Sequence, residues 1–529
     1  MSGNGKSGLR GPAGWIALLV LAVALAAEPA WAAKNVILMV SDGAGYNTWL
    51  ATSMYRGKLG AAVYDQPGWL HLSATTHPRS VADKPGQTAG RVRWLAYSPE
   101  LAWDTSPSPD GSFAAYAYLK RTATDSAAAG TALASGVKTY NNAINWTDDN
   151  APLRGRTIAE LAKAHGRAVG VVTTVQLSHA TPACLGGAHN PDRDHYAAIA
   201  NELLMAPYLD VIIGCGHPEF DDAGRPRERI TNWDYVGGKT TWEQLKAGTH
   251  PSGRKLIQTK EEFEALVSGP TPARLVGVAQ VATTLQQRRP APPPRPRGEP
   301  PIEPFETPMN TNVPSLETLV LGALNCLDDD PDGFYLGIEG GAVDWANHAN
   351  DPARMIEEQI DFLKAVEAVV RWIEDHGGWN ETLLILTADH DCGLPWGPKS
   401  DVQPFAPIED RGAGRMPGLK YNARGHSNSL VPLLARGAGS ERLSALVVGR
   451  DPQAAQRWGV SGRYADNTAV FVAMFCALKE KTGRRQASAA TAGAVNCLGR
   501  GRFGRPYVPG SCGNRRGNGG GDFGGNGCR

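Results

Sequence analysis

Acidic, histidine and threonine side chains stand just after several short apolar runs in this 529-residue sequence. They are Asp42 in SDGAG, His179 and Thr181 in LSHATPA, Glu339 after FYLGI, and Asp389 and His390 in TADHD. A single acid after an apolar run is a common turn residue. Four such places together predict a binding site, because ligands bind at the carboxyl ends of the strands in an open α/β sheet.

A second set of metal-ligand residue types follows Glu339 closely. Asp344 and His348 are four positions apart at the start of a helical pattern, GGAVDWANHAND. This spacing puts both on one helical face, where they could bind one ion. A lone Asp–His pair of this kind is more often a surface hydrogen bond, but its place five residues after Glu339 favours a ligand pair. His426, in the loop sequence GHS, adds another histidine. Aspartate and histidine are ligands of catalytic zinc, and carboxylates with a hydroxyl suit magnesium.

Ser126 is the candidate nucleophile. The sequence TDSAAAGTA predicts the start of a helix of small residues, which Asp125 or Ser126 would cap and Gly136 would end. Capping alone would account for Ser126. A helix N-terminus also attracts anions through its free N–H groups and its dipole, so a serine there can face a phosphate. The residues alone leave both interpretations open.

The elements that must position these side chains alternate between strands and helices. Continuous apolar runs predict strands buried on both faces, at Asn35–Ser41, Ala168–Val175, Leu209–Gly214, Phe334–Ile338 and Thr382–Thr387. Helical patterns cover Thr157–His165 and Asp351–Ile373. We therefore expect an α/β fold with a doubly wound, mostly parallel central sheet flanked by helices.

The overall charge excludes some functions. The chain has 53 basic and 52 acidic side chains, a formal charge of +1. This balance argues against a nucleic-acid-binding protein and against disorder caused by self-repulsion. It still permits an anionic substrate, because a bound metal or a single arginine makes a local positive site.

The N-terminus predicts export. Met1–Gly14 carries Lys6 and Arg10 but no acid, and Trp15–Ala27 is an apolar run of 13 residues. That run is shorter than the roughly 20 residues that span a membrane. With the small-residue pattern at 30–32, it predicts a signal peptide over residues 1–32 and a mature protein that is periplasmic or secreted, with no membrane span.

Residues 33–485 are expected to form the catalytic domain, interrupted by a proline- and arginine-rich surface insertion at 286–308 between helical segments. A tail rich in Gly, Arg and Cys occupies 486–529. The chain has eight cysteines, and export permits disulfides. None forms a Cys-x-x-Cys pair, so no cysteine zinc site is expected. Cys512 and Cys528 are candidates to pair with each other or with Cys497, and the connectivity stays open.

Four segments carry a resemblance to a known family. TATDSAAAGTALASGVKTYNNAI resembles the nucleophile segment of the alkaline phosphatase family. IEGGAVDWANHAND, ILTADHD and ARGHSNSLVPLLARG resemble its metal-binding blocks, in the family's order. The resemblance runs from about Lys34 to about Thr482.

The resemblance implies a role for each matching residue. Ser126 matches the nucleophile that becomes phosphorylated, and Arg193, in HNPDRDHY, matches the arginine that binds phosphate. The ligands implied for a first zinc ion are Asp344, His348 and His426. Those implied for a second zinc ion are Asp42, Asp389 and His390, and those for one magnesium ion are Asp42, Thr181 and Glu339. A solvated loop arginine is the alternative for Arg193, although its two-pronged guanidinium suits phosphate well.

The activity implied is hydrolysis of phosphomonoesters at alkaline pH through a phosphoserine, commonly by a homodimer. A sulfatase would need a Cys/Ser-x-Pro-x-Arg segment, which Ser126 and the residues after it do not form. A phosphodiesterase stays open because pocket loops decide that choice. Two departures concern His179 and Trp345, a pairing similar to that of some other bacterial members. It leaves open whether His179 contacts a third metal or only its waters; we favour a neutral histidine beside the waters.

Overall fold

The computed structural model describes residues 33–87, 95–108, 111–291 and 302–479. The centre of the fold is β1 (Asn35–Ser41), whose seven residues are all buried. Such an uninterrupted apolar run suits a strand that is covered on both faces. β1 pairs in parallel with β8 (Thr382–Thr387) on one side and with β7 (Phe334–Gly340) on the other. β7 in turn pairs in parallel with β3 (Ala168–Gln176).

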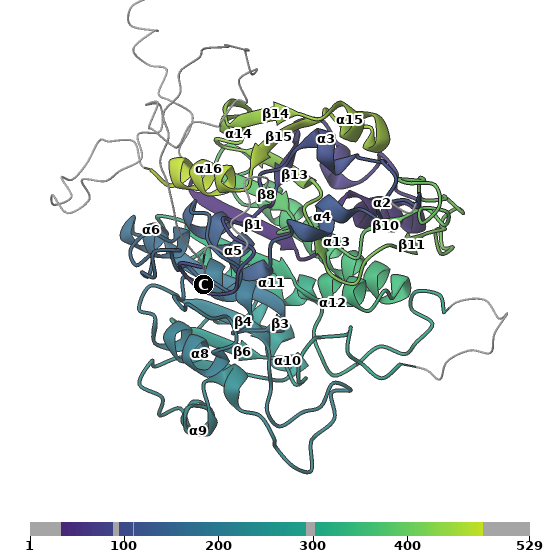
Figure 1. The fold of residues 1–529 in the computed structure, drawn as a ribbon. Coiled ribbons are helices and arrows are strands. Elements are labelled where there is room, and N and C mark those ends of the chain that lie inside the picture. Colours follow the sequence, from purple (N-terminus) through teal and green to yellow (C-terminus); the bar gives the residue numbers. More distant parts are fainter. Residues whose placement is uncertain (1–32, 88–94, 109–110, 292–301, 480–529) are drawn as a thin grey trace, which may run out of the picture. The chain divides into compact units, whose positions relative to one another are not determined.

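Within the described residues these strands form the middle of an eleven-stranded sheet (Figure 1). Beyond β3, the parallel pairing continues through β4 (Val211–Cys215), β6 (Leu275–Val278) and β5 (Lys255–Ile257). On the other side, β13 (Val431–Gly437) runs antiparallel to both β8 and β2 (Leu70–Thr75). The edge there is formed by β15 (Arg463–Asp466) and β14 (Val447–Arg450). The expected α/β class with a mostly parallel sheet is confirmed.

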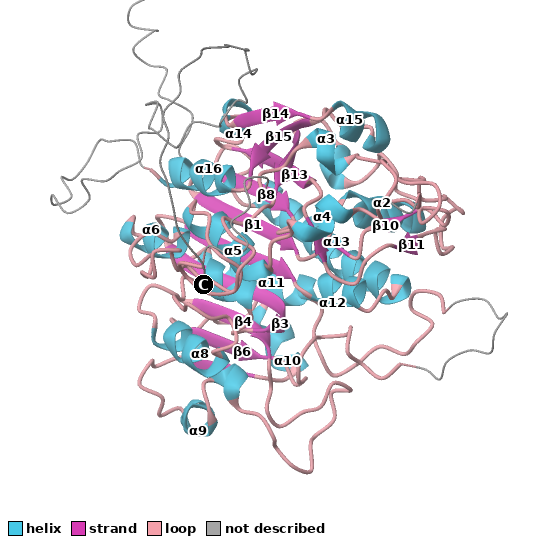
Figure 2. Ribbon diagram, in the orientation of Figure 1, coloured by secondary structure: helices cyan, strands magenta, loops and turns pink. Residues whose placement is uncertain are grey.

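Helices cover the sheet in two groups, shown in cyan in Figure 2. One group contains α2 (Tyr46–Arg56), α10 (Lys260–Leu266), α11 (Leu316–Leu327) and α13 (Pro352–Asp375). The other contains α5 (Ser126–Ser135), α6 (Ile158–Ala164), α7 (Ala180–Leu185) and α16 (Thr468–Leu478). In β7, Gly337 packs against Leu185 of α7, whereas Gly340 packs against Phe362 of α13. Residues three apart in a strand point to opposite faces, so the two groups cover opposite faces of the sheet.

Shorter elements complete the described fold. The remaining helices are α3 (Pro99–Ala102), α4 (Ala117–Arg121), α8 (Tyr196–Met205), α9 (Lys239–Ala247), α12 (Ala342–His348), α14 (Arg442–Ala445) and α15 (Pro452–Trp458), with 3-10 turns η1 (Val63–Asp65) and η2 (Asp234–Val236). The remaining strands are β9 (Asp391–Cys392), β10 (Pro395–Trp396), β11 (Lys420–Tyr421) and β12 (His426–Ser427).

The proline-rich segment differs from the expectation in two ways. It follows strand β6 rather than a helix, before α11. Its described ends are also tightly packed: Arg289 is only 3% exposed and forms an ion pair of 2.7 Å with Glu357 of α13. The segment is therefore anchored where it leaves and rejoins the domain.

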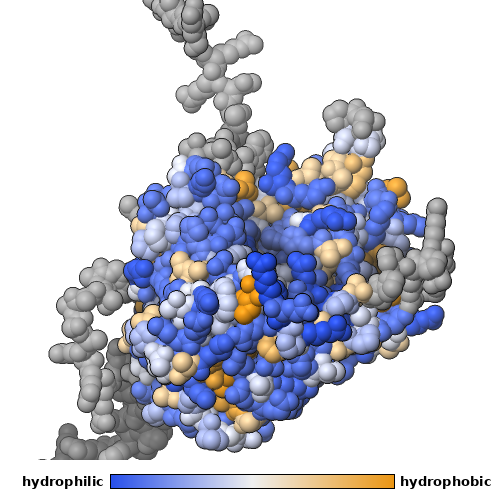
Figure 3. All heavy atoms as spheres, turned by 90° about the horizontal axis from the view of Figure 1, so that it is seen from below, coloured by the Kyte–Doolittle hydropathy of each residue, from blue (hydrophilic) through white to orange (hydrophobic). Residues whose placement is uncertain are grey.

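Several expectations fall outside the described residues. These are the signal peptide at 1–32, the tail at 486–529 and the pairing of Cys497, Cys512 and Cys528. Cys184, Cys215, Cys326 and Cys392 are free thiols. The surface seen in Figure 3 is mainly hydrophilic, with small scattered apolar groups. In the described part of the chain, no helix has both the length and the apolar character needed to cross a membrane.

Candidate active site and metal centre

The candidate site lies at the carboxyl ends of four adjacent strands, β8, β1, β7 and β3. Asp42 follows β1 directly, Glu339 is near the end of β7, and Asp389 and His390 follow β8. Thr181 lies in α7, just after β3. Parallel strands deliver their carboxyl ends to one edge of the sheet, so residues far apart in the sequence meet there.

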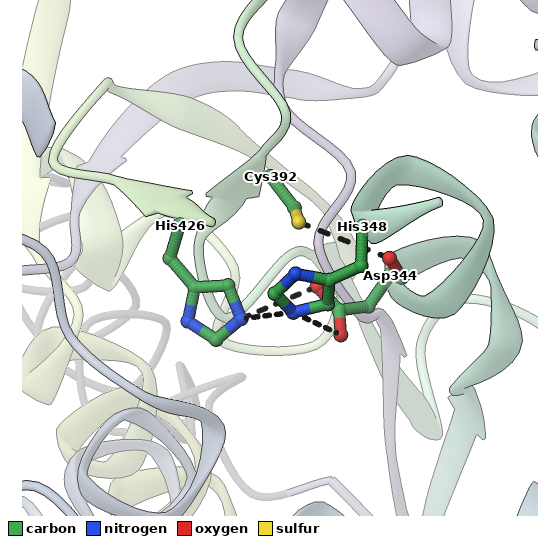
Figure 4. Close-up of side chains that lie close together, drawn as sticks. All are labelled: Asp344, His348, Cys392 and His426. Atoms are coloured by element: carbon green, nitrogen blue, oxygen red, sulfur yellow. Dashed lines mark hydrogen bonds and ion pairs between the residues drawn. The ribbon is translucent and has the colours of Figure 1, made fainter. Parts of the chain in front are cut away.

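Asp344, His348 and His426 form the first ligand group. His348 Nε2 lies 3.2 Å from Asp344 Oδ2, and His426 Nε2 lies 3.4 Å from Asp344 Oδ1. The two histidine Nε2 atoms are 3.0 Å apart, so three ligand atoms point at one place (Figure 4). α12 supplies the aspartate and His348 one turn apart, and β12 supplies His426.

Backbone carbonyls orient both histidines. His426 Nδ1 donates to the carbonyl of Thr124 at 2.8 Å, and His348 Nδ1 donates to the carbonyl of Arg424. A proton on Nδ1 leaves the Nε2 lone pair free for a cation, which is how proteins prepare histidine ligands. The alternative interpretation of Asp344 and His348 as a surface hydrogen bond does not describe this convergence.

Asp42, Asp389 and His390 form the second ligand group, and all three are buried. His390 Nε2 lies 3.1 Å from Asp389 Oδ2 and 3.6 Å from Asp42 Oδ1. The loop after β1 orients Asp389, because Asp389 Oδ1 accepts from the backbone N–H of Gly43 at 3.0 Å. Gly43 has φ of 69°, and a Cβ there would meet Asp344 within 2.6 Å, so only glycine lets the loop after β1 reach both groups.

Two carboxylates of the site, Asp42 and Glu339, lack the charge compensation that burial demands. Burial raises the pKa of Asp42 well above its usual value, and the nearby carboxylates of Asp389, Asp344 and Glu339 raise it further. Burial likewise raises the pKa of Glu339, to about 7. Burial also acts to raise the pKa of Asp344 and Asp389, but the neighbouring histidines outweigh it and lower the pKa of both. Buried oxygens without a hydrogen-bond partner are Asp42 Oδ1, Thr181 Oγ1, Glu339 Oε1, Asp344 Oδ1 and Asp389 Oδ2. Oxygens left unpaired in such a place fit bound cations.

Ser126 is the first residue of α5, and the structure separates its role from capping. Asp125 is the N-cap and accepts from Ala128 N at 2.9 Å. Of the two residues that the sequence offered as the cap, Asp125 and Ser126, it is therefore Asp125 that caps the helix. Gly136 ends the helix as predicted, with φ of 69°. The hydroxyl of Ser126 is therefore not used for capping. Its Oγ faces the two ligand groups and lies 3.2 Å from His390 Nε2.

An ion pair with Asp125 positions the side chain of Arg193 at the same site. Its guanidinium donates to Asp125 Oδ2 at 2.9 Å, and both side chains are mostly buried. Burial opposes the charge of Arg193, but Asp125 raises its pKa and keeps it a cation. The alternative of a solvated loop arginine is therefore wrong.

His179 lies between Arg193 and aromatic rings. Burial and the charge of Arg193 lower its pKa to about 3, so it is neutral. Its ring stacks at 6.4 Å on Tyr196 and lies 5.7 Å from Trp345. The neutral state agrees with the favoured interpretation, and the choice between a metal and its waters stays a prediction.

Sequence reasoning missed four residues of the site. Asp125 was considered only as a cap. Cys392, whose Sγ is 3.8 Å from the carbonyl oxygen of Asp344, joins the first ligand group (Figure 4). Its position two residues after His390 was the available signal. Gln287 and Arg288 line the cavity at Ser126, but they lie in a low-complexity segment that gave no signal.

Comparisons with known proteins agree with this geometry. A sequence model described as alkaline phosphatase matches residues 109–410. The chain is 30% identical over 369 residues to alkaline phosphatase 3 of Bacillus subtilis, covering 68% of this chain and 61% of that protein. It is 30% identical over 315 residues to the alkaline phosphatase of Escherichia coli, covering 53% and 61%.

Solved structures show the same fold. A cold-active alkaline phosphatase from Shewanella gives a TM-score of 0.55 at 24% identity, covering 84% of this chain and 100% of that one. The enzyme of the Antarctic bacterium TAB5 gives 0.54 at 22%, covering 85% and 99%. The fold, the site and the sequence match together define an α/β protein with two groups of candidate metal ligands at the sheet edge. The chain belongs to the alkaline phosphatase family.

Proposed function

We propose that the protein is an alkaline phosphatase, which hydrolyses phosphomonoesters through a phosphoserine on Ser126 and releases inorganic phosphate. The observation that carries the proposal is the position of Ser126 Oγ, 3.2 Å from His390 Nε2 at a helix N-terminus. The matched region covers only 61% of each of the two relatives named above, so their activity comes to this chain as a proposal.

The residues act in a defined order. Ser126 gives its proton to solvent and its Oγ bonds to phosphorus in line, while the bond from phosphorus to the leaving oxygen breaks and that oxygen takes up a proton from solvent. Water then hydrolyses the phosphoserine and restores the hydroxyl. Arg193, held by Asp125, and the free N–H groups of α5 neutralise the phosphoryl oxygens during both steps.

Three ions would be held by the ligand groups described above. One zinc ion fits Asp344, His348 and His426; a second fits Asp42, Asp389 and His390; a magnesium ion fits Asp42, Thr181 and Glu339. When bound, such ions supply positive charge beside the attacking and leaving oxygens. A variant of the TAB5 enzyme has Mg bound in its M3 site, which supports the magnesium assignment. Neutral histidine ligands favour alkaline pH, because protonation ejects zinc.

The test is an assay of p-nitrophenyl phosphate against its bis-ester across pH, with and without chelator, together with metal analysis. The proposal expects alkaline, chelator-sensitive monoesterase activity with about two zinc ions per chain. Ser126→Ala should bind zinc normally and lose the activity. A Ser126→Ala protein that hydrolyses the monoester at the wild-type rate would sink the proposal, and preference for the bis-ester would favour a phosphodiesterase.

The proposal extends to the state of the mature protein. It places the enzyme in the periplasm or outside the cell after removal of residues 1–32, as a homodimer. N-terminal sequencing of the exported protein checks the cleavage, and light scattering after size-exclusion chromatography checks the dimer.

A further inference from the structure

A cavity of about 420 Å³ opens above Ser126. Arg193 and His426 line it on the side of the site already described, and Gln287, Arg288 and Trp345 line it as well. The last three have no role in the steps proposed above. Two of them come from the segment between β6 and α11.

Hydrogen bonds and an ion pair hold in place the part of the cavity wall that this segment forms. Arg289 is almost fully buried, and its guanidinium donates to Glu357 Oε2 at 2.7 Å and to the carbonyl of Thr307 at 3.1 Å. Arg354 of α13 donates to the carbonyl of Gln286 at 3.0 Å and to that of Arg289 at 3.2 Å. The backbone is therefore fixed immediately before Gln287 and immediately after Arg288.

Among the described residues, Arg288 presents a cation without a carboxylate counter-charge. Its guanidinium lies over the ring of Trp345, 5.2 Å from the ring centre, which positions the charge by a cation–π contact. Arg193 is paired with Asp125, whereas no carboxylate in the described ranges forms an ion pair with Arg288. The donors of this exposed arginine are thus free for an anion in the cavity.

The position of Arg288 determines which part of a bound substrate its guanidinium can contact. An in-line displacement puts the attacking and leaving oxygens on opposite sides of phosphorus. Ser126 attacks from the side of His390, so the leaving group departs toward Asp344, His348 and His426. Arg288 stacks on Trp345 and lines the same cavity as Asp344, His348 and His426. Arg288 therefore lines the cavity into which the leaving group departs.

We propose that Arg288 is a specificity-determining residue that pairs with a second anionic group on the leaving alcohol. The preferred substrates are then phosphomonoesters whose alcohol carries a carboxylate or another phosphate. Gln287 supports this use of the cavity, because its Oε1 is buried without a partner and can accept from a hydroxyl of such an alcohol. The inference rests on the proposed phosphomonoesterase activity.

The experiment compares two phenyl phosphates that differ only in a ring substituent, a carboxylate or the isosteric neutral carboxamide, each in its meta and para forms. The readout is the ratio of kcat/KM for the carboxylate to that for the carboxamide. Arg288→Gln should lower this ratio about fivefold, the size expected of an ion pair that is open to solvent. Arg288→Lys should restore most of it, and salt should weaken the wild-type preference.

Arg371→Gln is the matched control, because this exposed arginine pairs with Glu317 and does not line the cavity. It should leave the ratio unchanged. An unchanged ratio in Arg288→Gln, or an equal loss on both substrates, overturns the inference while the phosphatase proposal stands. Failure of the wild-type protein to hydrolyse either compound refutes the phosphatase proposal itself.

Discussion

Asp125 and Arg193 form an ion pair of 2.9 Å, and the same aspartate caps the helix that begins at Ser126. One carboxylate thus sets both the start of the helix that carries the proposed nucleophile and the position of the proposed phosphate-binding cation. Its two oxygens are divided between these tasks, since Oδ1 accepts from Ala128 N and Oδ2 accepts from Arg193.

The two tasks of Asp125 can be separated by substitution. Asn caps helices as well as Asp does, so Asp125→Asn should keep the cap of α5 and lose only the contacts that Oδ2 makes with Arg193 and with the backbone N–H of Asn142. We expect kcat/KM for a phosphomonoester to fall roughly tenfold to a hundredfold from the misplaced cation. Asp125→Ala should lose about 1 kcal/mol of stability in addition. Thermal unfolding and steady-state kinetics check both variants; equal stability of the two would contradict the capping role.

Arg193 should discriminate monoesters from diesters. A monoester carries one more charged oxygen than a diester, and under the proposed function the guanidinium, which lines the cavity at Ser126, pairs with it. Arg193→Met should therefore reduce kcat/KM for p-nitrophenyl phosphate by about a hundredfold or more, with a much smaller loss on the bis-ester. A uniform loss on both esters would show that Arg193 does not recognise the extra charge.

Removal of metal should destabilise the fold as well as abolish activity. Four carboxylates, Asp42, Glu339, Asp344 and Asp389, are buried together, and burial raises the pKa of Asp42 and Glu339, which need a counter-charge. Chelation should lower the melting temperature, and zinc plus magnesium should restore it, because ligands that bind only the folded state stabilise it. Differential scanning calorimetry with and without chelator measures the shift. An identical melting temperature would show that cations are not what compensates the cluster.

The anchor of the proline-rich segment should be sensitive to substitution. Arg289 and Glu357 are both buried, so Arg289→Met leaves an uncompensated carboxylate and should cost about 3–5 kcal/mol. The double variant Arg289→Met, Glu357→Leu should recover much of that loss. Chemical denaturation of the single and double variants measures both values. Additive losses would mean that the ion pair is not the anchor.

His189 should make stability fall at alkaline pH. Burial lowers the pKa of this histidine, but Glu160 and Glu202 outweigh that effect and raise it to about 9. Because the folded pKa exceeds the unfolded value of about 6.5, the stabilisation is complete below about pH 6.5 and is lost as pH rises through about 9. The change is on the order of 3 kcal/mol. Urea unfolding across this range should show the decline, and His189→Gln should flatten it.

The continuous apolar strands could be predicted because burial on both faces leaves a strong signal. β1 and β8 begin and end where the sequence indicated, and β3 and β7 extend only one or two residues further. β2, with the sequence LHLSAT, and β15, with RYAD, were missed because they mix polar and apolar residues near the antiparallel side of the sheet.

The candidate site could be predicted as far as local motifs reach. Ten residues named from the sequence meet at one edge of the sheet, although their individual roles remain predictions. Arg288 could not be found this way, because its position depends on the ion pair between Arg289 and Glu357, 68 positions apart. The second role of Asp125 likewise depends on Arg193, 68 positions further along the chain.

The hydrogen bond from His426 to the carbonyl of Thr124 joins residues 302 positions apart. A chain that emerges from the ribosome N-terminus first makes the nucleophile segment early and this histidine late. Neither the imidazole nor the loop before Ser126 has its partner until β12 has been synthesised and has folded back. Under the proposed function, chains that end before β12 lack His426 and should therefore be inactive.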